Sequence, residues 1–291
     1  TEPSVVLRGA SGRSGGDRGA SRFRAALATV QRGPLVSAPE QLERVVLSLR
    51  DALRAAGFSS LVLGPRFAGE ERRAAEETLA RCGFAALPAA EQALHIVTGK
   101  VALDGTEEEI LASFKQRGRR AIRKAAERAT VREAAAEDLP ACQRLLDAFH
   151  ARRPDYDARG QADVAAQARL VAALGGGLLV AEEEGRIVGF HSFVRQGRDA
   201  IWLAMAGDDD PKAPRGYLLL WEAMRRARAL GLSGYDLAGL APEGAESGRD
   251  QFKTAFAPVR EELLPAHLAA LKPVRHAVFF TLRRLYRARR R

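Results

Sequence analysis

The sequence predicts an α/β fold of two domains, each built from a mixed sheet flanked by helices. Three observations predict it. Short apolar strands alternate with amphipathic helices in the first half, three segments of period-two hydrophobicity follow one another after residue 177, and an Arg-Gly dipeptide precedes a helix in both halves. Because 291 residues exceed the usual size of one domain, we place one domain at 1–130 and the other at 131–291.

The first half alternates strands and helices. We expect a strand at 25–31, a helix at 39–56, a strand at 59–63, a helix at 69–81, and a hairpin or two strands at 84–98. Leucines and valines recur at helical spacing in the first of these helices. The segment 9–20 carries five glycines and is expected to be a flexible loop. It lacks the lysine and hydroxyl pair of a nucleotide-hydrolysing P-loop.

Three helices are expected in the middle of the chain. Thr106 and Glu109 have the spacing of a capping box, which predicts a helix from 106 to about 129. Further helices are expected at 138–149 and 162–174, and the three glycines that follow end the last one.

The second half turns to the two-residue period of strands. Segments 178–182, 186–194 and 199–206 are separated by short glycine-containing turns, which predicts a three-stranded antiparallel meander. A polar loop at 207–216, a helix at 217–230 and a strand at 234–240 are expected next. We interpret the order shared by the two halves as a weak internal duplication.

Composition and charge limit the function classes. The net charge of +10 and the pI of about 10.3 favour polyanionic partners such as nucleic acid or an anionic membrane. The five histidines stand singly and the two cysteines lie far apart in apolar patterns, so we expect no metal site and no disulfide. No apolar run of membrane-spanning length and no signal peptide pattern is found, so we expect a cytoplasmic protein. We also expect a monomer that needs no cofactor.

The turn before the helix at Arg215-Gly216 would offer free backbone N–H groups to an anion. This order of elements resembles the core of the GNAT acetyltransferases, in which the turn holds the pyrophosphate of acetyl-coenzyme A. The resemblance implies two GNAT-like (acyl-CoA N-acyltransferase) domains. Here the usual glycine spacing is incomplete, and Pro211 and Pro214 interrupt the loop. An ordinary capped helix therefore remains the alternative to a coenzyme A site.

Four further segments carry a more specific resemblance. In order along the chain they are 31–34, 110–115 continuing into 119–125, 234–236, and 251–253 with Phe256 behind it. Together they resemble the FemAB family of aminoacyl-tRNA-dependent transferases, which pair two GNAT-like domains, and the resemblance covers most of the chain. It implies transfer of an amino acid from aminoacyl-tRNA to an amine, with no acyl-enzyme. The acceptor is either a peptidoglycan precursor or a small amine of specialised metabolism.

The resemblance makes Phe252 and Lys253 the catalytic signature. Aminolysis of an ester passes through a tetrahedral oxyanion, which the Lys253 ammonium could stabilise while Phe252 shields it from water. The alternative is a solvated surface lysine. Asp236 is the candidate to orient or deprotonate the attacking amine. Tyr235 is either near the acceptor or a buried core residue. The remaining candidate substrate-binding residues are Arg32, Arg215, Gly216 and Tyr217.

Two basic segments are candidates for contact with polyanions. The helix expected from 106 carries cations that recur on one face, where a solvated helix would interleave both signs. Its candidate tRNA-binding residues are Lys115, Arg119, Arg120, Arg123 and Lys124, and Arg117 and Arg128 broaden the surface. Six arginines among residues 283–291 follow an apolar stretch, a pattern typical of contact with tRNA, of peripheral contact with an anionic membrane, or of a disordered basic end.

Two other function classes stay open. A plain acyl-coenzyme A N-acyltransferase would use the turn at 207–216 and would need no basic helix. A non-catalytic RNA-binding protein would keep the two halves only as a scaffold, since a fold does not determine a function.

Overall fold

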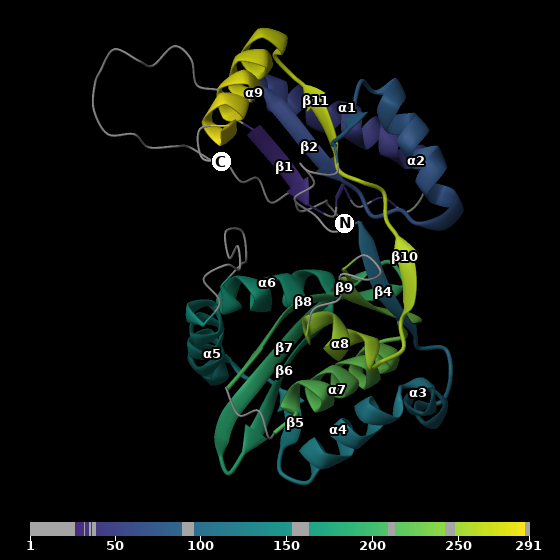
Figure 1. The fold of residues 1–291 in the computed structure, drawn as a ribbon, viewed down its shortest axis with the longest axis vertical. Helices are drawn as coiled ribbons and strands as arrows, with labels where there is room; N and C mark the ends of the chain where they lie inside the picture. Colours follow the sequence, from purple (N-terminus) through teal and green to yellow (C-terminus); the bar gives the residue numbers. More distant parts are fainter. Residues whose placement is uncertain are drawn as a thin grey trace, which may run out of the picture. The chain divides into compact units, whose positions relative to one another are not determined.

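The computed structural model describes residues 27–31, 33–34, 36, 39–88, 96–152, 163–208, 213–241 and 248–288. It divides the chain into two compact units (Figure 1). The split unit comprises residues 1–96 and 261–291, and the continuous unit comprises residues 97–260. Arg32 and the glycine-rich segment 9–20 lie outside the described residues, so the expectations for them stay predictions from sequence.

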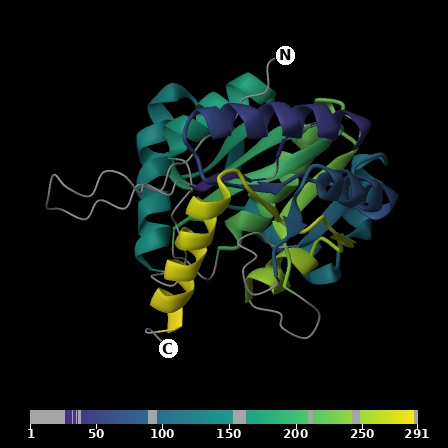
Figure 2. The ribbon, with the colours of Figure 1, turned by 90° about the horizontal axis from the view of Figure 1, so that it is seen from above.

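The split unit is a four-stranded mixed sheet with helices. Its strands are β1 (Leu27–Gln31), β2 (Ser60–Gly64), β3 (Ala85–Ala86) and β11 (His267–Ala270), in the order β1-β2-β11-β3. β1 is parallel to β2, whereas β11 is antiparallel to both β2 and β3. The helices are α1 (Pro39–Ala55), α2 (Gly69–Arg81) and α9 (Pro273–Ala288), the last drawn in yellow in Figure 2.

The continuous unit contains most of the second, seven-stranded mixed sheet, in the order β10-β4-β9-β8-β7-β6-β5. The strands are β4 (Val97–Ala102), β5 (Thr130–Glu133), β6 (Gly176–Glu183), β7 (Arg186–Gln196), β8 (Asp199–Gly207), β9 (Gly234–Gly239) and β10 (Val259–Glu262). The predicted meander is β6-β7-β8, because each of these strands is antiparallel to the next.

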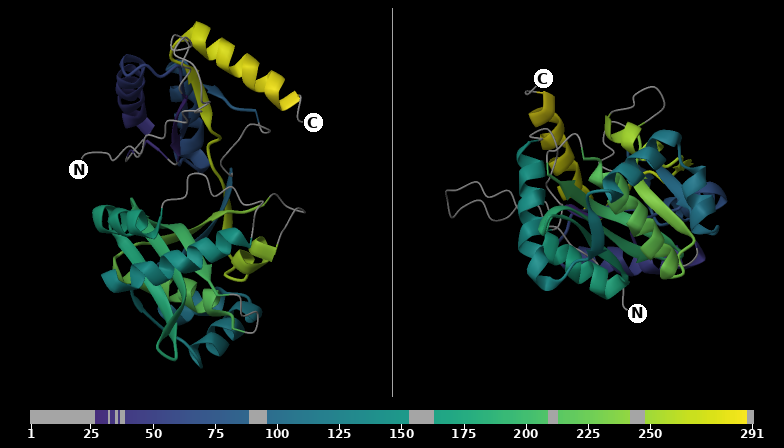
Figure 3. Two further views of the ribbon diagram at one scale, coloured as in Figure 1. Left: turned by 90° about the vertical axis from the view of Figure 1, so that its left-hand side faces the viewer. Right: turned by 90° about the horizontal axis from the view of Figure 1, so that it is seen from below.

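Helices cover both faces of this sheet (Figures 1 and 3). They are α3 (Glu107–Ser113), α4 (Gln116–Ala126), α5 (Leu139–Ala151), α6 (Val164–Leu174), α7 (Arg215–Ala229) and α8 (Gly248–Thr254), with a 3-10 turn at Ala136–Asp138. Alternate residues of β6 enter different cores. Leu179 and Ala181 join the core of α4 and α7, whereas Leu178 and Val180 join the core of α5 and α6. Alternation therefore gives the sheet two buried faces.

The single helix predicted at 106–129 is in fact two helices. The capping box is formed, since Glu109 N donates to Thr106 Oγ1 and Thr106 N donates to Glu109 Oε2. At Phe114 the backbone becomes extended, with ψ of 151°, and its ring packs edge-on against Trp221 and Phe256. Burial of the Phe114 ring is favoured over continuation of the helix, so α3 ends before this residue and α4 begins after it.

The two units do not coincide with the boundary predicted near residue 130. β4 already pairs with β9, so the continuous unit begins at residue 97. The chain then returns after residue 260, and β11 inserts between β2 and β3. Sequence patterning missed the short elements β5, β10, β11 and α8. It also missed the 16-residue helix α9, where only an apolar stretch and a basic end were expected. The expected hairpin at 84–98 also differs, because β3 and β4 belong to different sheets.

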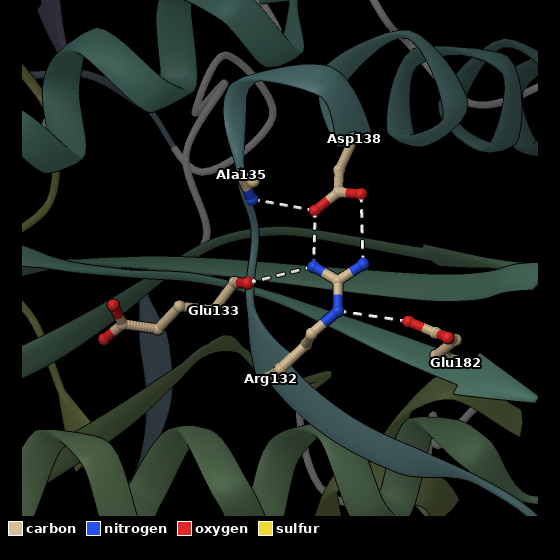
Figure 4. Close-up of polar contacts among 5 residues, drawn as sticks. All are labelled: Arg132, Glu133, Ala135, Asp138 and Glu182. Carbon is tan, nitrogen blue, oxygen red and sulfur yellow. Dashed lines mark hydrogen bonds and ion pairs between the residues drawn. The ribbon is translucent and has the colours of Figure 1, made fainter. Parts of the chain in front are cut away.

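The edge strand β5 is fixed by a bidentate ion pair (Figure 4). The Arg132 guanidinium contacts both carboxylate oxygens of Asp138, at 2.5 and 3.1 Å, and Arg132 Nε also donates to Glu182 on β6 at 3.1 Å. Asp138 in turn accepts from Ala135 N at 2.7 Å. Hydrogen bonds from Arg132 hold the pKa of the Asp138 carboxyl below its usual range. This network joins β5 to the helices that follow it.

The described residues contain neither a helix that could span a membrane nor a cluster of metal ligands. No helix in these ranges combines the length and the apolar character needed to cross a bilayer. No three His, Cys, Asp or Glu side chains among them gather as a metal site requires. Cys82 and Cys142 are separate buried thiols.

Candidate active site

The candidate site lies where β8 and β9 separate. These strands are parallel, and they pair only from Asp199 with Gly234 to Ile201 with Asp236. β8 continues to Gly207 and β9 to Gly239 without further pairing between them. The residues that follow Ile201 on β8 and Asp236 on β9 therefore border the gap between the two diverging strands.

Lys253 bridges the two separating strands. Its side chain comes from α8 and is only 4% exposed. Nζ donates to the carbonyl oxygen of Gly239, at the end of β9, over 2.7 Å. The same atom lies 5.2 Å from the centre of the Trp202 ring on β8. Burial of an ammonium is costly unless it is hydrogen-bonded and faces a charge or an aromatic ring. Lys253 is thus a buried, held cation and not a solvated surface lysine.

Aromatic side chains form one wall beside this lysine. Phe252 is half-buried, and its ring lies 4.6 Å from that of Tyr217, 5.6 Å from that of Phe256 and 6.3 Å from that of Trp202. Gly216 completes the contact, because a Cβ added there would lie 3.6 Å from the Phe252 ring and 3.3 Å from the sulfur of Met205. The structure therefore brings Gly216, Tyr217, Phe252 and Lys253 together.

Tyr235 is a core residue. It is fully buried, and its hydroxyl lies 2.5 Å from Nε2 of His191 on β7. Burial raises the pKa of the Tyr235 phenol well above its usual range. Burial also lowers the pKa of His191 to about 3. Both side chains are therefore neutral near pH 7. Among the described residues, His191 Nδ1 has no hydrogen bond of normal geometry.

Asp236 is buried on the opposite face of β9 from Tyr235, as successive strand residues must be. Its Oδ1 accepts from the Thr98 hydroxyl on β4 and from Ala238 N, the latter at 2.7 Å. Ala238 has a positive φ of 60°. The carboxylate therefore stabilises an unusual backbone turn next to Gly239, whose carbonyl holds Lys253.

Arg215 is engaged by carboxylates at the start of α7. Its Nε donates to Glu183 Oε2 at 2.8 Å, and its Nη1 to Asp208 Oδ1 at 2.5 Å. Arg128 also pairs with Glu183, at 2.6 Å. Hydrogen bonds from Arg215 hold the pKa of the Glu183 carboxyl below its usual range. A solvent-open cavity of about 120 Å³ lies here, with Asp208, Arg215 and Gly216 among its lining residues.

The basic residues of α4 divide into two groups. Arg119 donates to the Ala112 carbonyl at 3.0 Å and to that of Phe114, so it caps the end of α3. Arg117 donates to Thr254 Oγ1 at 2.9 Å and to the Gln251 carbonyl, so it ties α4 to α8. Four exposed residues have no ion pair or hydrogen bond to another described side chain. These α4 cations are Lys115, Arg120, Arg123 and Lys124.

Sequence reasoning missed three contributors to this site. Trp202 faces the Lys253 ammonium, Thr98 supports Asp236, and Arg117 holds α8. Arg117 was expected only as part of a basic surface. The role of the Gly239 carbonyl could not be predicted from the sequence, because every residue has a backbone carbonyl group.

Comparisons with known proteins identify the fold. Residues 112–254, from α3 to the end of α8, match the family described as "Acetyltransferase (GNAT) domain". No curated protein matches the sequence. The solved structure of FemX is similar with a TM-score of 0.71 and 16% identity, over 89% of this chain and 84% of that one. The predicted α/β class with two mixed sheets is thereby confirmed.

Two further structures share the fold. That of L-PGS from Bacillus licheniformis has a TM-score of 0.54 and 12% identity, covering 90% of this chain and 83% of that one. The other is the C-terminal domain (DUF2156) of a putative lysylphosphatidylglycerol synthetase from Agrobacterium fabrum. Its TM-score is 0.51 at 18% identity, and the match covers 88% of this chain and 81% of that one.

Proposed function

We propose that the protein transfers an aminoacyl group from aminoacyl-tRNA to an amine, on the premise that residues 112–254 match the acetyltransferase (GNAT) domain family. One observation carries the proposal: a buried lysine, Lys253, is held between the two strands that separate in the sheet. The sequence resemblance to FemAB transferases and the fold shared with FemX support the same reaction class.

The proposed reaction is direct aminolysis of the aminoacyl ester. The amine nitrogen attacks the ester carbonyl, a C–N bond forms, and the oxygen becomes an oxyanion. Collapse then breaks the C–O bond to the tRNA, whose leaving oxygen takes up a proton while the new amide nitrogen loses one. Lys253 stabilises the oxyanion, because its ammonium is fixed beforehand by Gly239 and Trp202 and need not reorganise. Phe252 excludes water beside it.

The other candidate residues take supporting roles in this proposal. Asp236 shapes the end of β9 through Ala238 and so positions the Gly239 carbonyl, and we assign it no proton transfer. Arg215 holds Glu183 and Asp208, whereas Gly216 and Tyr217 build the wall that orients Phe252. The α4 cations contact the tRNA backbone. The acceptor is a peptidoglycan precursor or a small amine.

The start of α7 favours a tRNA donor over coenzyme A. Bound pyrophosphate needs free backbone N–H groups or a free cation at a helix start. Here Pro214 precedes the helix and lacks an N–H, the Arg215 amide donates to the Ala213 carbonyl, and the Arg215 guanidinium is already paired. Asp208 adds a carboxylate to the same cavity.

Transfer of labelled amino acids tests the proposal. The full chain is supplied with a pool of radiolabelled aminoacyl-tRNAs and candidate amines, and label in an alkali-stable amide is measured. We expect Lys253→Met, which keeps length and removes charge, to lower the rate by about 10²–10³-fold. Lys272→Met, in the split unit, is the matched control and should keep the full rate. Turnover of acetyl-coenzyme A without transfer from any charged tRNA would overturn the proposal, and so would undiminished transfer by Lys253→Met.

A further inference from the structure

Helix α9 presents an apolar stripe to solvent. Val274 and Val278 are 73% and 43% exposed, and Ala277 and Thr281 beside them are exposed as well. The spacing of three, four and seven residues places all four side chains on one face of the helix. Four large hydrophobic side chains are exposed in the described part of the chain, and only these two valines share an element.

A different side of α9 is anchored to the protein. His276 Nδ1 lies 3.0 Å from the hydroxyl of Ser60 on β2, and the His276 ring packs at 4.5 Å against Phe280. His276 is two residues from both valines, which sets it well apart from the stripe on a helix of 3.6 residues per turn. The helix is therefore fixed by one side while the other faces outward.

The same part of the chain is strongly cationic. Residues 263–291 contain Lys272, Arg275 and six further arginines, and they contain no Asp or Glu. Eight positive charges thus fall within 29 residues, in a chain whose net charge is +10. An exposed aliphatic stripe on a helix in such a segment has the composition of a helix that lies in the interface of an anionic bilayer.

We propose that α9 docks on an anionic phospholipid surface, with Val274 and Val278 inserted at the boundary between headgroups and acyl chains. The arginines supply attraction to the anionic headgroups, and the valines supply the apolar contact. An RNA partner would use the same cations and would leave the aliphatic stripe without a role. The docking surface goes beyond the proposed reaction and does not depend on it.

Vesicle flotation with the full chain tests the docking surface. The vesicles are phosphatidylcholine alone, or phosphatidylcholine and phosphatidylglycerol in equal parts. We expect flotation with the anionic vesicles only. The double variant Val274→Ser/Val278→Ser should lower the partition coefficient about tenfold or more, because two aliphatic side chains no longer leave water. Val259→Ser is the matched control, since Val259 is 68% exposed on β10, and it should bind as the wild type does.

Three other results would overturn the inference. Equal flotation of the double variant and the wild type would mean that charge alone binds the vesicles. A tenfold loss of binding to a tRNA pool by the double variant, with no flotation of the wild type, would make the stripe part of an RNA surface. Sedimentation that shows a dimer in the wild type and a monomer in the double variant would instead make it a contact with a second copy. In each case circular dichroism checks that the variant is folded, because both tryptophans lie in the continuous unit and do not report on α9.

Discussion

Acidification should destabilise the continuous unit through His191. This side chain is fully buried, and burial lowers its pKa to about 3 in the folded protein. In the unfolded chain the pKa of histidine is about 6.5. Between these two values the unfolded state binds the additional proton, so stability falls as the pH falls from about 6.5 towards 3.

The size of the effect follows from the two pKa values. Between pH 7 and pH 5 the linkage removes about 2 kcal/mol of unfolding free energy, which is a large part of a typical domain's stability. Asp138 and Glu183, whose carboxyl pKa values are lowered by arginine, add acid sensitivity mainly below about pH 4. The loss of unfolding free energy between pH 7 and pH 5 is therefore caused mainly by protonation of histidine.

Urea unfolding followed by tryptophan fluorescence measures this interval. The two tryptophans, Trp202 and Trp221, both lie in the continuous unit, whose other histidine is His150. His191→Gln retains an acceptor for the Tyr235 hydroxyl and removes the titration. The variant is expected to be less stable at pH 7 and nearly indifferent to the change to pH 5. Equal losses in the wild type and the variant would refute the assignment of the acid sensitivity to His191.

Two further predictions concern the continuous unit. Replacing all four α4 cations with glutamine should reduce the slope of log affinity for tRNA against log salt concentration by about 3, as expected for the loss of four phosphate contacts. Filter binding measures this slope. An unchanged slope would mean that the α4 cations do not contact tRNA. Gly176→Ala should lower the unfolding free energy by about 1–3 kcal/mol, because its Cβ would lie 2.2 Å from the carbonyl oxygen of Phe193 and 2.9 Å from Val194 Cα, backbone atoms of β7 that cannot swing aside. Gly248→Ala, with no atom within 4 Å, is the control in the same urea titration, and equal stability of the two variants would contradict the steric argument.

Local patterns predicted most of the elements that are long or regularly periodic, and the 16-residue helix α9 is the exception. The helix at 69–81 and the meander were expected at nearly their observed positions, because hydrophobic periodicity and turn glycines determine them locally. The break at Phe114 was not expected, since apolar residues continue at helical spacing through it. Its cause is the contact with Trp221, more than a hundred residues away. β11 was missed because its short sequence becomes a strand only by pairing with β2.

The candidate site was predictable in residue type and not in detail. Phe252 and Lys253 came from the family resemblance, and the structure locates them beside Gly216 and Tyr217. Arg215 looked like a free cation because its partner Glu183 is 32 residues away and belongs to another element. Pairing across such a distance depends on the tertiary fold, which neither charge pattern nor spacing reveals.

The interruption of one unit by the other also determines when each can be completed on the ribosome. Every strand from β4 to β9 has been synthesised before residue 267 leaves the ribosome, so the continuous unit can bury its core first. The split unit, although it contains the earlier residues, must wait for β11 to fill the position between β2 and β3. Until then β2 has an open edge, which is the kind of surface that pairs with other nascent chains. During synthesis the continuous unit can therefore be completed before the split unit, although the split unit contains the earlier residues.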